Sequence, residues 1–267
     1  SIYDMTPGAI VADHYRVVRP HRQGGMSSAF QVVDQRVDEP RELQFFPPAL
    51  FEGDEQAGEF AHAWEPWTRV SSASVLKVHE LVELGPASMI LITDYPPEES
   101  LREHLREMPR LGTAAAVEMG CQLLSGLVAI HEQGLVHGDI KPHTIHVAEG
   151  DANQAVLVDG GITPGLWSAK GLGEKTALIG TPYYSPAQQF SGDAPDVQSD
   201  IYNVATVLYE VLTGVLPWSG RNILEVFQAK LERTAPPMKE RAPEVSVPSD
   251  LEAAIQGGLM AERTERY

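Results

Sequence analysis

The stretch VHGDIKPHTI, residues 136–145, decides how the rest of the sequence is interpreted. It consists of a short apolar run, a polar loop and a second apolar run. Asp139 and Lys141 lie two positions apart in that loop. A carboxylate there could accept a proton, and the neighbouring ammonium group could neutralise negative charge on a reacting group. The pattern predicts a loop that carries polar chemistry between two buried segments.

The composition limits the classes of partner and the compartment. With 267 residues and 43% hydrophobic residues, the chain can bury a substantial core. A formal net charge of −17 opposes contact with a phosphate backbone, so we expect no nucleic-acid partner. No apolar run reaches about 20 residues and no signal peptide is recognisable, so we expect no membrane insertion of this segment. We expect a cytoplasmic location, as a separate protein or as part of a longer, even membrane-anchored, one.

Strand patterns fill the first third of the chain and helix patterns fill the rest. Residues 1–14 have the character of a leader. Strands are predicted over residues 15–18, 29–33, 43–46, 75–78 and 89–92, with one helix whose apolar face carries Phe60, Ala63, Trp64 and Trp67. Beyond the connector Tyr95-Pro96-Pro97, helices are predicted over residues 101–108, 113–132, 201–212, 222–232 and 250–260. This order predicts a two-lobed α+β arrangement, with Cys121 as a buried thiol on an apolar helical stripe.

Five further landmarks follow in order and give the sequence its family resemblance. They are Gln23-Gly24-Gly25-Met26-Ser27, Val158-Asp159-Gly160-Gly161, Gly180-Thr181-Pro182-Tyr183-Tyr184, Ser199-Asp200-Ile201-Tyr202-Asn203 and Arg266-Tyr267. With residues 136–145 they resemble the motifs of protein kinases, bacterial serine/threonine kinases in particular. The resemblance covers residues 15–267 and implies a protein kinase-like fold. Its small β-rich N-lobe would span residues 15–95, its hinge 94–97 and its larger, mainly helical C-lobe 98–267.

On the nucleotide side of this resemblance, three positions depart from the family. Gly24 and Gly25 match the glycine-rich phosphate loop, but Arg22 takes the place of its first glycine. Arg22 would hinder close approach of the backbone to phosphate, although a guanidinium group could itself attract phosphate. Phe46 takes the place of the strand lysine that contacts the α- and β-phosphates, and its neighbours Gln44, Phe45 and Pro47, the other residues that could align there, are not lysine either. Pro96 takes the place of a hinge residue whose N–H binds adenine, and proline has no N–H.

The catalytic loop keeps some family positions and loses others. Asp139 and Lys141 match the base and its neighbouring lysine. Thr144 replaces the asparagine that would hold a second Mg²⁺, and Gly138 replaces the arginine that would pair with a phosphorylated activation segment. We expect Asp139 and Lys141 to be vestigial and His137 to be a packing residue.

The metal motif Asp-Phe-Gly becomes Asp159-Gly160-Gly161. Asp159 retains a carboxylate that could hold Mg²⁺, but Gly160 removes the phenylalanine that fixes the active pose. Positions that hold the C-lobe together are better kept. Asp200 matches the aspartate that braces the catalytic-loop backbone, and Gln188 can still hydrogen-bond to the arginine matched by Arg266.

Losses at nucleotide- and metal-binding positions, on a retained fold, imply a pseudokinase. We expect a catalytically impaired domain that acts as a protein-binding or regulatory signalling module and needs no cofactor. Its partner would be a protein, such as an active kinase or a phosphopeptide-binding protein. Thr163, Thr176 and Thr181 lie in the segment that is phosphorylated in such kinases, and they are candidate phosphoacceptors.

Two alternatives remain open. The chain could be an atypical active serine/threonine kinase that uses ATP and Mg²⁺ with Asp139, Lys141 and Asp159. It would then need a relocated cation, such as Lys77 or Arg22. It could also be a nucleotide sensor that binds ATP without turnover.

Overall fold

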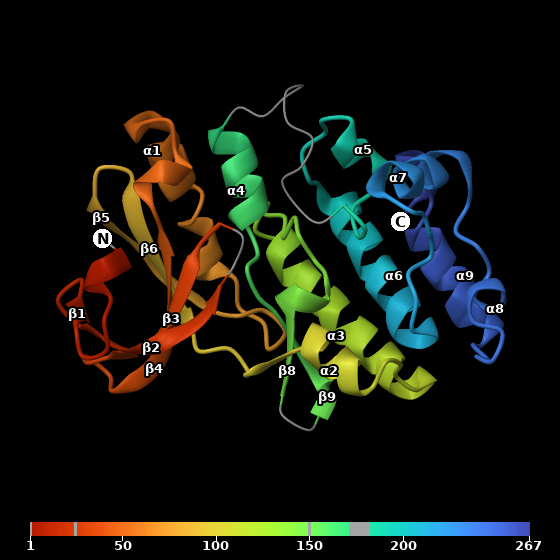
Figure 1. Cartoon of the computed structure of the whole chain (residues 1–267), viewed down its shortest axis with the longest axis horizontal. Helices are drawn as coiled ribbons and strands as arrows, with labels where there is room; N and C mark the ends of the chain where they lie inside the picture. The colour runs from red at the N-terminus through yellow and green to blue at the C-terminus, as the bar shows by residue number, and fades with distance from the viewer. Residues whose placement is uncertain (1, 24–25, 149–150, 171–181) are drawn as a thin grey trace.

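Figure 1 shows the computed structural model of the chain, which describes residues 2–23, 26–148, 151–170 and 182–267. A sheet-rich lobe and a helical lobe lie side by side, and the chain passes from one to the other after β6 (Ser88–Asp94). This is the two-lobed α+β fold expected from the order of strand and helix patterns.

The N-lobe is built on a six-stranded antiparallel sheet. Its strands, in spatial order, are β1 (Ile10–Val11), β2 (Tyr15–Gln23), β3 (Ser28–Asp34), β4 (Glu39–Phe46), β6 (Ser88–Asp94) and β5 (Val78–Gly85). One apolar cluster of this lobe contains Tyr15, Val32 and Ile90. Within residues 2–14, Ile10–Val11 forms β1 and pairs with β2, and Met5 is buried in the same cluster.

The other face of the sheet meets α1 (Asp54–His62), which lies between the 3-10 turns Pro48–Leu50 and Pro66–Arg69. The helix ends ahead of Pro66, as a proline at that position predicts. Five aromatic rings in mutual contact join β4 to these elements: Phe46, Phe51, Phe60, Trp64 and Trp67. The strand predicted over residues 75–78 begins only at Val78, because Val75 forms an isolated bridge with Leu157.

The C-lobe is mainly helical. Its helices are α2 (Leu101–Glu107), α3 (Thr113–His131), α4 (Ile162–Ala169), α5 (Ala187–Phe190), α6 (Val197–Thr213), α7 (Ile223–Glu232), α8 (Met238–Arg241) and α9 (Ser249–Gly258). A small sheet of β7 (Glu99–Ser100), β8 (Ile145–Ala148) and β9 (Asp151–Leu157) follows the connector. Ser100 caps α2 through a capping box with Glu103. Helix α6 is buried on nearly every side, as its apolar sequence predicts.

Helix α3 packs against β9 and α6 as a core helix of this lobe. By length and composition alone it is also long and apolar enough to cross a membrane. Its stripe of Val117, Cys121 and Leu124 is exposed, so the expectation of a buried thiol at Cys121 was wrong. The stripe faces a groove of about 400 Å³ between α3, α6 and α9, and no other part of the described chain covers it.

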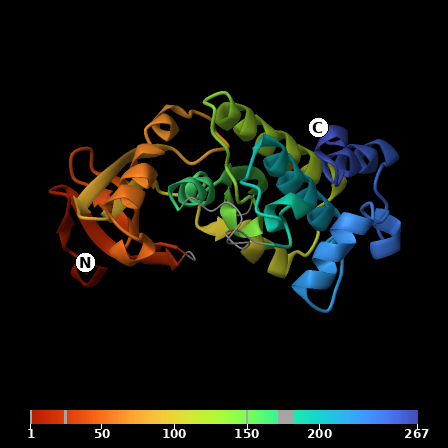
Figure 2. The same cartoon turned by 90° about the horizontal axis from the view of Figure 1, so that it is seen from above.

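Helix α4 was not predicted from the sequence and follows the Asp159-Gly160-Gly161 motif directly. In Figures 1 and 2 it lies between the two lobes, and it packs against α1 of the N-lobe. The segment after the motif therefore contributes to the boundary between the lobes.

Candidate functional site

Arg22, near the end of β2, reaches the C-lobe and binds two carboxylates. Its Nη1 and Nη2 donate to Oδ2 and Oδ1 of Asp159 at 2.7 and 2.8 Å. Its Nε and Nη2 donate to the two oxygens of Glu42 at 2.9 and 2.5 Å. Both contacts are bidentate, the geometry in which arginine–carboxylate pairs are strongest. One guanidinium group thus joins β2, β4 and the start of the 159–161 motif.

Alternate residues of β4 face this contact. Glu42, Gln44 and Phe46 point to the same side, because successive strand residues point to opposite faces, and all three are buried. Gln44 Nε2 donates to Oδ1 of Asp159 at 2.9 Å. The Asp159 carboxylate therefore accepts hydrogen bonds from both Arg22 and Gln44.

The three charged groups hold one another in their ionised forms. Burial would raise the pKa of Asp159, but the charge of Arg22 and the hydrogen bonds from Arg22 and Gln44 lower it to about 2. Burial also opposes ionisation of Glu42, and hydrogen bonds from Arg22 and His21 keep its pKa below the usual range. Desolvation of Arg22 is outweighed by Asp159 and Glu42, so the pKa of Arg22 is raised. All three are charged at neutral pH.

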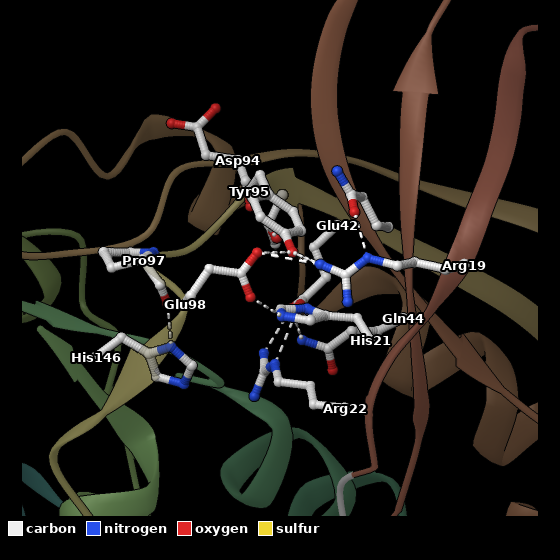
Figure 3. Close-up of polar contacts among 12 residues, drawn as sticks. Arg19, His21, Arg22, Glu42, Gln44, Asp94, Tyr95, Pro97, Glu98 and His146 are labelled. Atoms are coloured by element: carbon white, nitrogen blue, oxygen red, sulfur yellow. Dashed lines mark hydrogen bonds and ion pairs between the residues drawn. The ribbon is translucent and has the colours of Figure 1, made fainter. Parts of the chain in front are cut away.

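The same cluster extends toward the connector, as Figure 3 shows. His21 lies between two carboxylates, with Nδ1 2.8 Å from Glu42 Oε2 and Nε2 3.5 Å from Glu98 Oε2. Its ring lies against Tyr95, with centroids 4.9 Å apart. Arg19 donates to the Tyr95 hydroxyl and to Glu98 at 3.0 and 3.1 Å, which closes the outer edge of the cluster.

The connector offers few free backbone groups for hydrogen bonding at Pro96 and Pro97. Pro96 is buried and has no N–H to donate. The carbonyl oxygen of Pro97 accepts a hydrogen bond from Nδ1 of His146, on β8, at 2.6 Å (Figure 3). Burial lowers the pKa of His146, so its ring is neutral at pH 7 with the proton on Nδ1.

Phe46, predicted at the lysine position, lies in an apolar environment. It is fully buried and meets Phe60 of α1 edge to face, with ring centroids 5.0 Å apart. Lys77, considered above as a relocated cation, donates to the carbonyl oxygen of Thr68. The other candidate, Arg22, contacts Asp159 directly.

Gly160 and Gly161 leave room for the indole ring of Trp67. A Cβ atom added to Gly160 would lie 2.7 Å from Trp67 Cη2, and one added to Gly161 would lie 2.4 Å from Nε1, both too close for a real contact. Gly161 also has a φ of +82°, which favours glycine. Trp67 therefore fills the space where a phenylalanine side chain at position 160 would begin.

Two more glycines leave room for close packing around α4: Gly138 lies in the catalytic loop beside it, and Gly165 lies within α4 and faces α1. A Cβ atom at Gly138 would lie 2.4 Å from Cγ of Pro164, and φ at this residue is +87°. Gly165 faces the ring of Phe60, where an added Cβ would lie at 3.3 Å. The glycine that replaces the family's arginine thus lets α4 pack onto the catalytic loop.

The catalytic loop itself is well ordered by internal contacts. Asp139 Oδ2 lies 3.1 Å from Lys141 Nζ. The Thr144 hydroxyl donates to the carbonyl oxygen of Asp139 at 2.7 Å, so Thr144 braces the loop. Asp139, the predicted base, therefore lies next to its predicted cation Lys141, and the hydrogen bonds of Arg22 go to Glu42 and Asp159 instead.

The structure bears out three sequence expectations for the C-lobe. Asp200 accepts hydrogen bonds from the backbone N–H groups of His137 and Gly138, both at 2.9 Å. His137 is fully buried, as expected of a packing residue. Arg266 Nη2 donates to Gln188 Oε1 at 3.5 Å, a long hydrogen bond that retains part of the expected pairing.

The candidate phosphoacceptors are only partly described. Thr163 lies inside α4 and exposes 6% of its surface, so another kinase could reach its hydroxyl only if α4 moved. Thr176 and Thr181 lie outside the described residues, and so do Gly24 and Gly25 of the glycine-rich hairpin.

Sequence reasoning named Gln44 only as one option for the lysine position, and it missed four other residues of the site: His21, Glu42, Trp67 and His146. Glu42, just before the strand predicted over residues 43–46, and Gln44 within it alternate with apolar residues, which was a usable signal because polar side chains on the buried side need partners. His146 carried no local signal, since its partner Pro97 is 49 positions away.

The protein kinase domain family matches residues 53–266. Serine/threonine-protein kinase PknL of Mycobacterium bovis is 30% identical over 235 residues, which cover 87% of this chain and 57% of that protein. Probable serine/threonine-protein kinase PknB of Lactococcus lactis is 24% identical over 261 residues, 97% of this chain and 41% of that protein. The crystal structure of the Mycobacterium tuberculosis PknI kinase domain has a TM-score of 0.74 at 18% identity, covering 98% of this chain and 93% of that chain.

The chain spans about half the length of these two curated relatives. The structural likeness shows that the fold is that of a protein kinase domain. The match at residues 53–266 takes in most of the chain, and the chain belongs to the protein kinase domain family.

Proposed function

We propose that this chain is a pseudokinase domain, a kinase fold without phosphotransfer that works as a protein-binding or regulatory module. The contact of Arg22 with Asp159, at 2.7 and 2.8 Å, carries the proposal. In active members of the family, the aspartate of this motif holds Mg²⁺. Here each oxygen of that carboxylate already accepts a charge-assisted hydrogen bond from an arginine.

The residues present do not fit Mg²⁺. The ion requires near-octahedral oxygen ligands at about 2.0–2.1 Å. Asp159 is engaged by Arg22 and Gln44, and the hydroxyl of Thr144 is engaged with the Asp139 carbonyl.

A nucleotide would meet further obstacles. Pro96 offers no N–H, and the carbonyl of Pro97 is bonded to His146. The ionised Glu42 would repel phosphate groups, and Phe46 supplies no cation to attract them. Each effect weakens binding, and together they support a domain that works through protein contacts.

One observation favours the atypical active kinase as a second candidate. Asp139 and Lys141 remain paired at 3.1 Å, and Asp200 braces their loop. That activity, and equally a nucleotide sensor, would require Arg22 to release Asp159 to Mg²⁺.

A phosphotransfer assay separates these functions. The chain is incubated with radiolabelled ATP, Mg²⁺ or Mn²⁺ and a general protein acceptor, beside the Asp139→Asn variant. The proposal expects equal background labelling from both proteins. Transfer by the wild type that is lost in Asp139→Asn would establish the active kinase instead.

A further inference from the structure

A basic corner, consisting of Arg102, Arg106, Lys141 and His143, lies where α2 meets the 3-10 turn Pro142–Thr144. Arg102 and Arg106 are one helical turn apart, so they share a face of α2. His143 is on the turn, and Lys141 precedes it. Arg102, Arg106 and Lys141 are the members that are charged at pH 7, in a chain whose formal net charge is −17.

The inner member of the basic corner is held in place. Arg102 Nη1 donates to Glu210 Oε1 at 3.0 Å, and Nη2 donates to the hydroxyl of Tyr184. Its side chain is 26% exposed. An arginine with its conformation already fixed loses little entropy when a ligand arrives.

Of the two outer members, Arg106 is charged at pH 7, whereas the pKa of His143 is lowered and its ring is neutral. Arg106 and His143 are exposed, and neither makes a hydrogen bond or ion pair with any residue that the structure describes. Burial lowers the pKa of His143, and the charges of Arg102, Lys141 and Arg106 lower it further, so three cations act on this one ring.

Two nearby carboxylates have other partners. Asp139 is paired with Lys141, and it is the one carboxylate among the main influences on His143. Glu103 accepts from Ser100 in the capping box of α2. Arg102 and Arg106, like charges four positions apart on a helix, repel each other.

We propose that the basic corner binds a phosphate group carried on a serine or threonine of a protein partner. This inference rests on the proposed function as a protein-binding module and specifies the chemistry of the partner. The planar fork of an arginine matches phosphate oxygens, and Arg106 has that fork available. The acidic remainder of the chain repels a broadly acidic partner, so one dense charge on a short segment is the better fit.

Peptide binding by fluorescence anisotropy tests the inference. The probe is a labelled peptide mixture with a fixed central phosphothreonine between randomised residues, compared with the same mixture carrying threonine or glutamate. The full chain should bind the phosphothreonine mixture best. Arg106→Gln should weaken this binding roughly tenfold, the expected loss for one charged hydrogen-bonding group, and Arg106→Lys should weaken it less.

The matched control is Arg233→Gln. Arg233 is an exposed arginine at the end of α7, and its replacement changes the net charge by the same amount. It should leave binding within about twofold, since distant exposed charges are screened. Equal binding of the glutamate mixture, equal weakening by both variants, or no binding at all would overturn the inference. If the peptide does not bind and the phosphotransfer assay shows only background labelling, this inference fails while the proposed function stands, because the two experiments probe different residues.

Discussion

Arg22 and Asp159 bind each other through two parallel hydrogen bonds across the junction between the lobes, although they are 137 positions apart in the sequence. Each side chain exposes 20% of its surface, and the adjoining Glu42 side chain exposes none. Charges this poorly hydrated are stable only in the presence of their partners. The contact therefore accounts for both the cohesion of the junction and the proposed loss of metal binding.

Removing the guanidinium group should destabilise the domain. Arg22→Ala leaves the ionised Glu42 and Asp159 without a cation, and we expect a loss of about 3 kcal/mol in the free energy of unfolding. Urea denaturation measures it. Arg233→Ala, an exposed arginine of equal charge, should change stability by less than about 0.5 kcal/mol. Similar small losses in both variants would contradict the expectation.

Low pH should remove the contribution of the Asp159 carboxylate to the free energy of unfolding. Its pKa of about 2 in the folded chain lies below the unfolded value of about 3.9, so stability depends on the ionised form. The contribution, roughly 2 kcal/mol, is complete above about pH 5 and disappears as the pH falls toward 2. The stability gap between wild type and Asp159→Asn should close over that interval. A gap that stays constant with pH, or equals that of the exposed control Glu118→Gln, would refute this.

The elements of the fold could be predicted because their signals are local. The helices predicted over residues 113–132 and 201–212 correspond to α3 and α6, and the apolar positions of each belong to a single helix whose pattern is visible in the sequence. Cys121 was misplaced because the stripe it shares with Leu124 meets an open groove instead of a neighbour. Periodicity identifies an apolar face but not what covers it.

For the candidate site, the sequence could predict only which of the family's residues are missing. The family's strand lysine has no match at Phe46 or within two residues of it, and Gly160 stands where the family has a phenylalanine; that comparison needs only the sequence. What replaces the lost groups depends on contacts between distant residues: Arg22 with Asp159, and Trp67 with Gly160. Such pairs follow from how the lobes pack, which no spacing in the sequence reveals.

Restoring the family's phenylalanine should not be tolerated. In Gly160→Phe, the new Cβ would meet Trp67 at 2.7 Å, and overpacking of this kind should cost about 2–3 kcal/mol. The double variant Gly160→Phe with Trp67→Ala should lose less stability than the sum of the two single losses, because the cavity left by the indole accepts the new ring. Gly58→Ala on α1, where nothing lies within 4 Å, is the control and should be neutral or slightly stabilising. Strict additivity of Trp67→Ala and Gly160→Phe would argue against direct packing.

Restoring the family's lysine should also fail. Phe46→Lys places an ammonium group against Phe60 without a carboxylate partner, and we expect a loss of about 3–5 kcal/mol without any gain in phosphotransfer. Phe46→Leu, which keeps the site apolar, should cost about 1.5 kcal/mol or less. Thermal or urea unfolding and the phosphotransfer assay measure both effects. A stable Phe46→Lys protein that labels an acceptor would show that one substitution is enough to restore activity.

Isothermal titration calorimetry with ATP, in the presence and absence of Mg²⁺, tests the central claim most directly. If Arg22 and Gln44 keep Asp159 engaged and the connector offers adenine no N–H, the chain should show no saturable heat up to about 1 mM nucleotide, with or without the metal. The account would be contradicted by saturable binding with a Kd below about 100 μM that requires Mg²⁺ and is lost in Asp159→Asn.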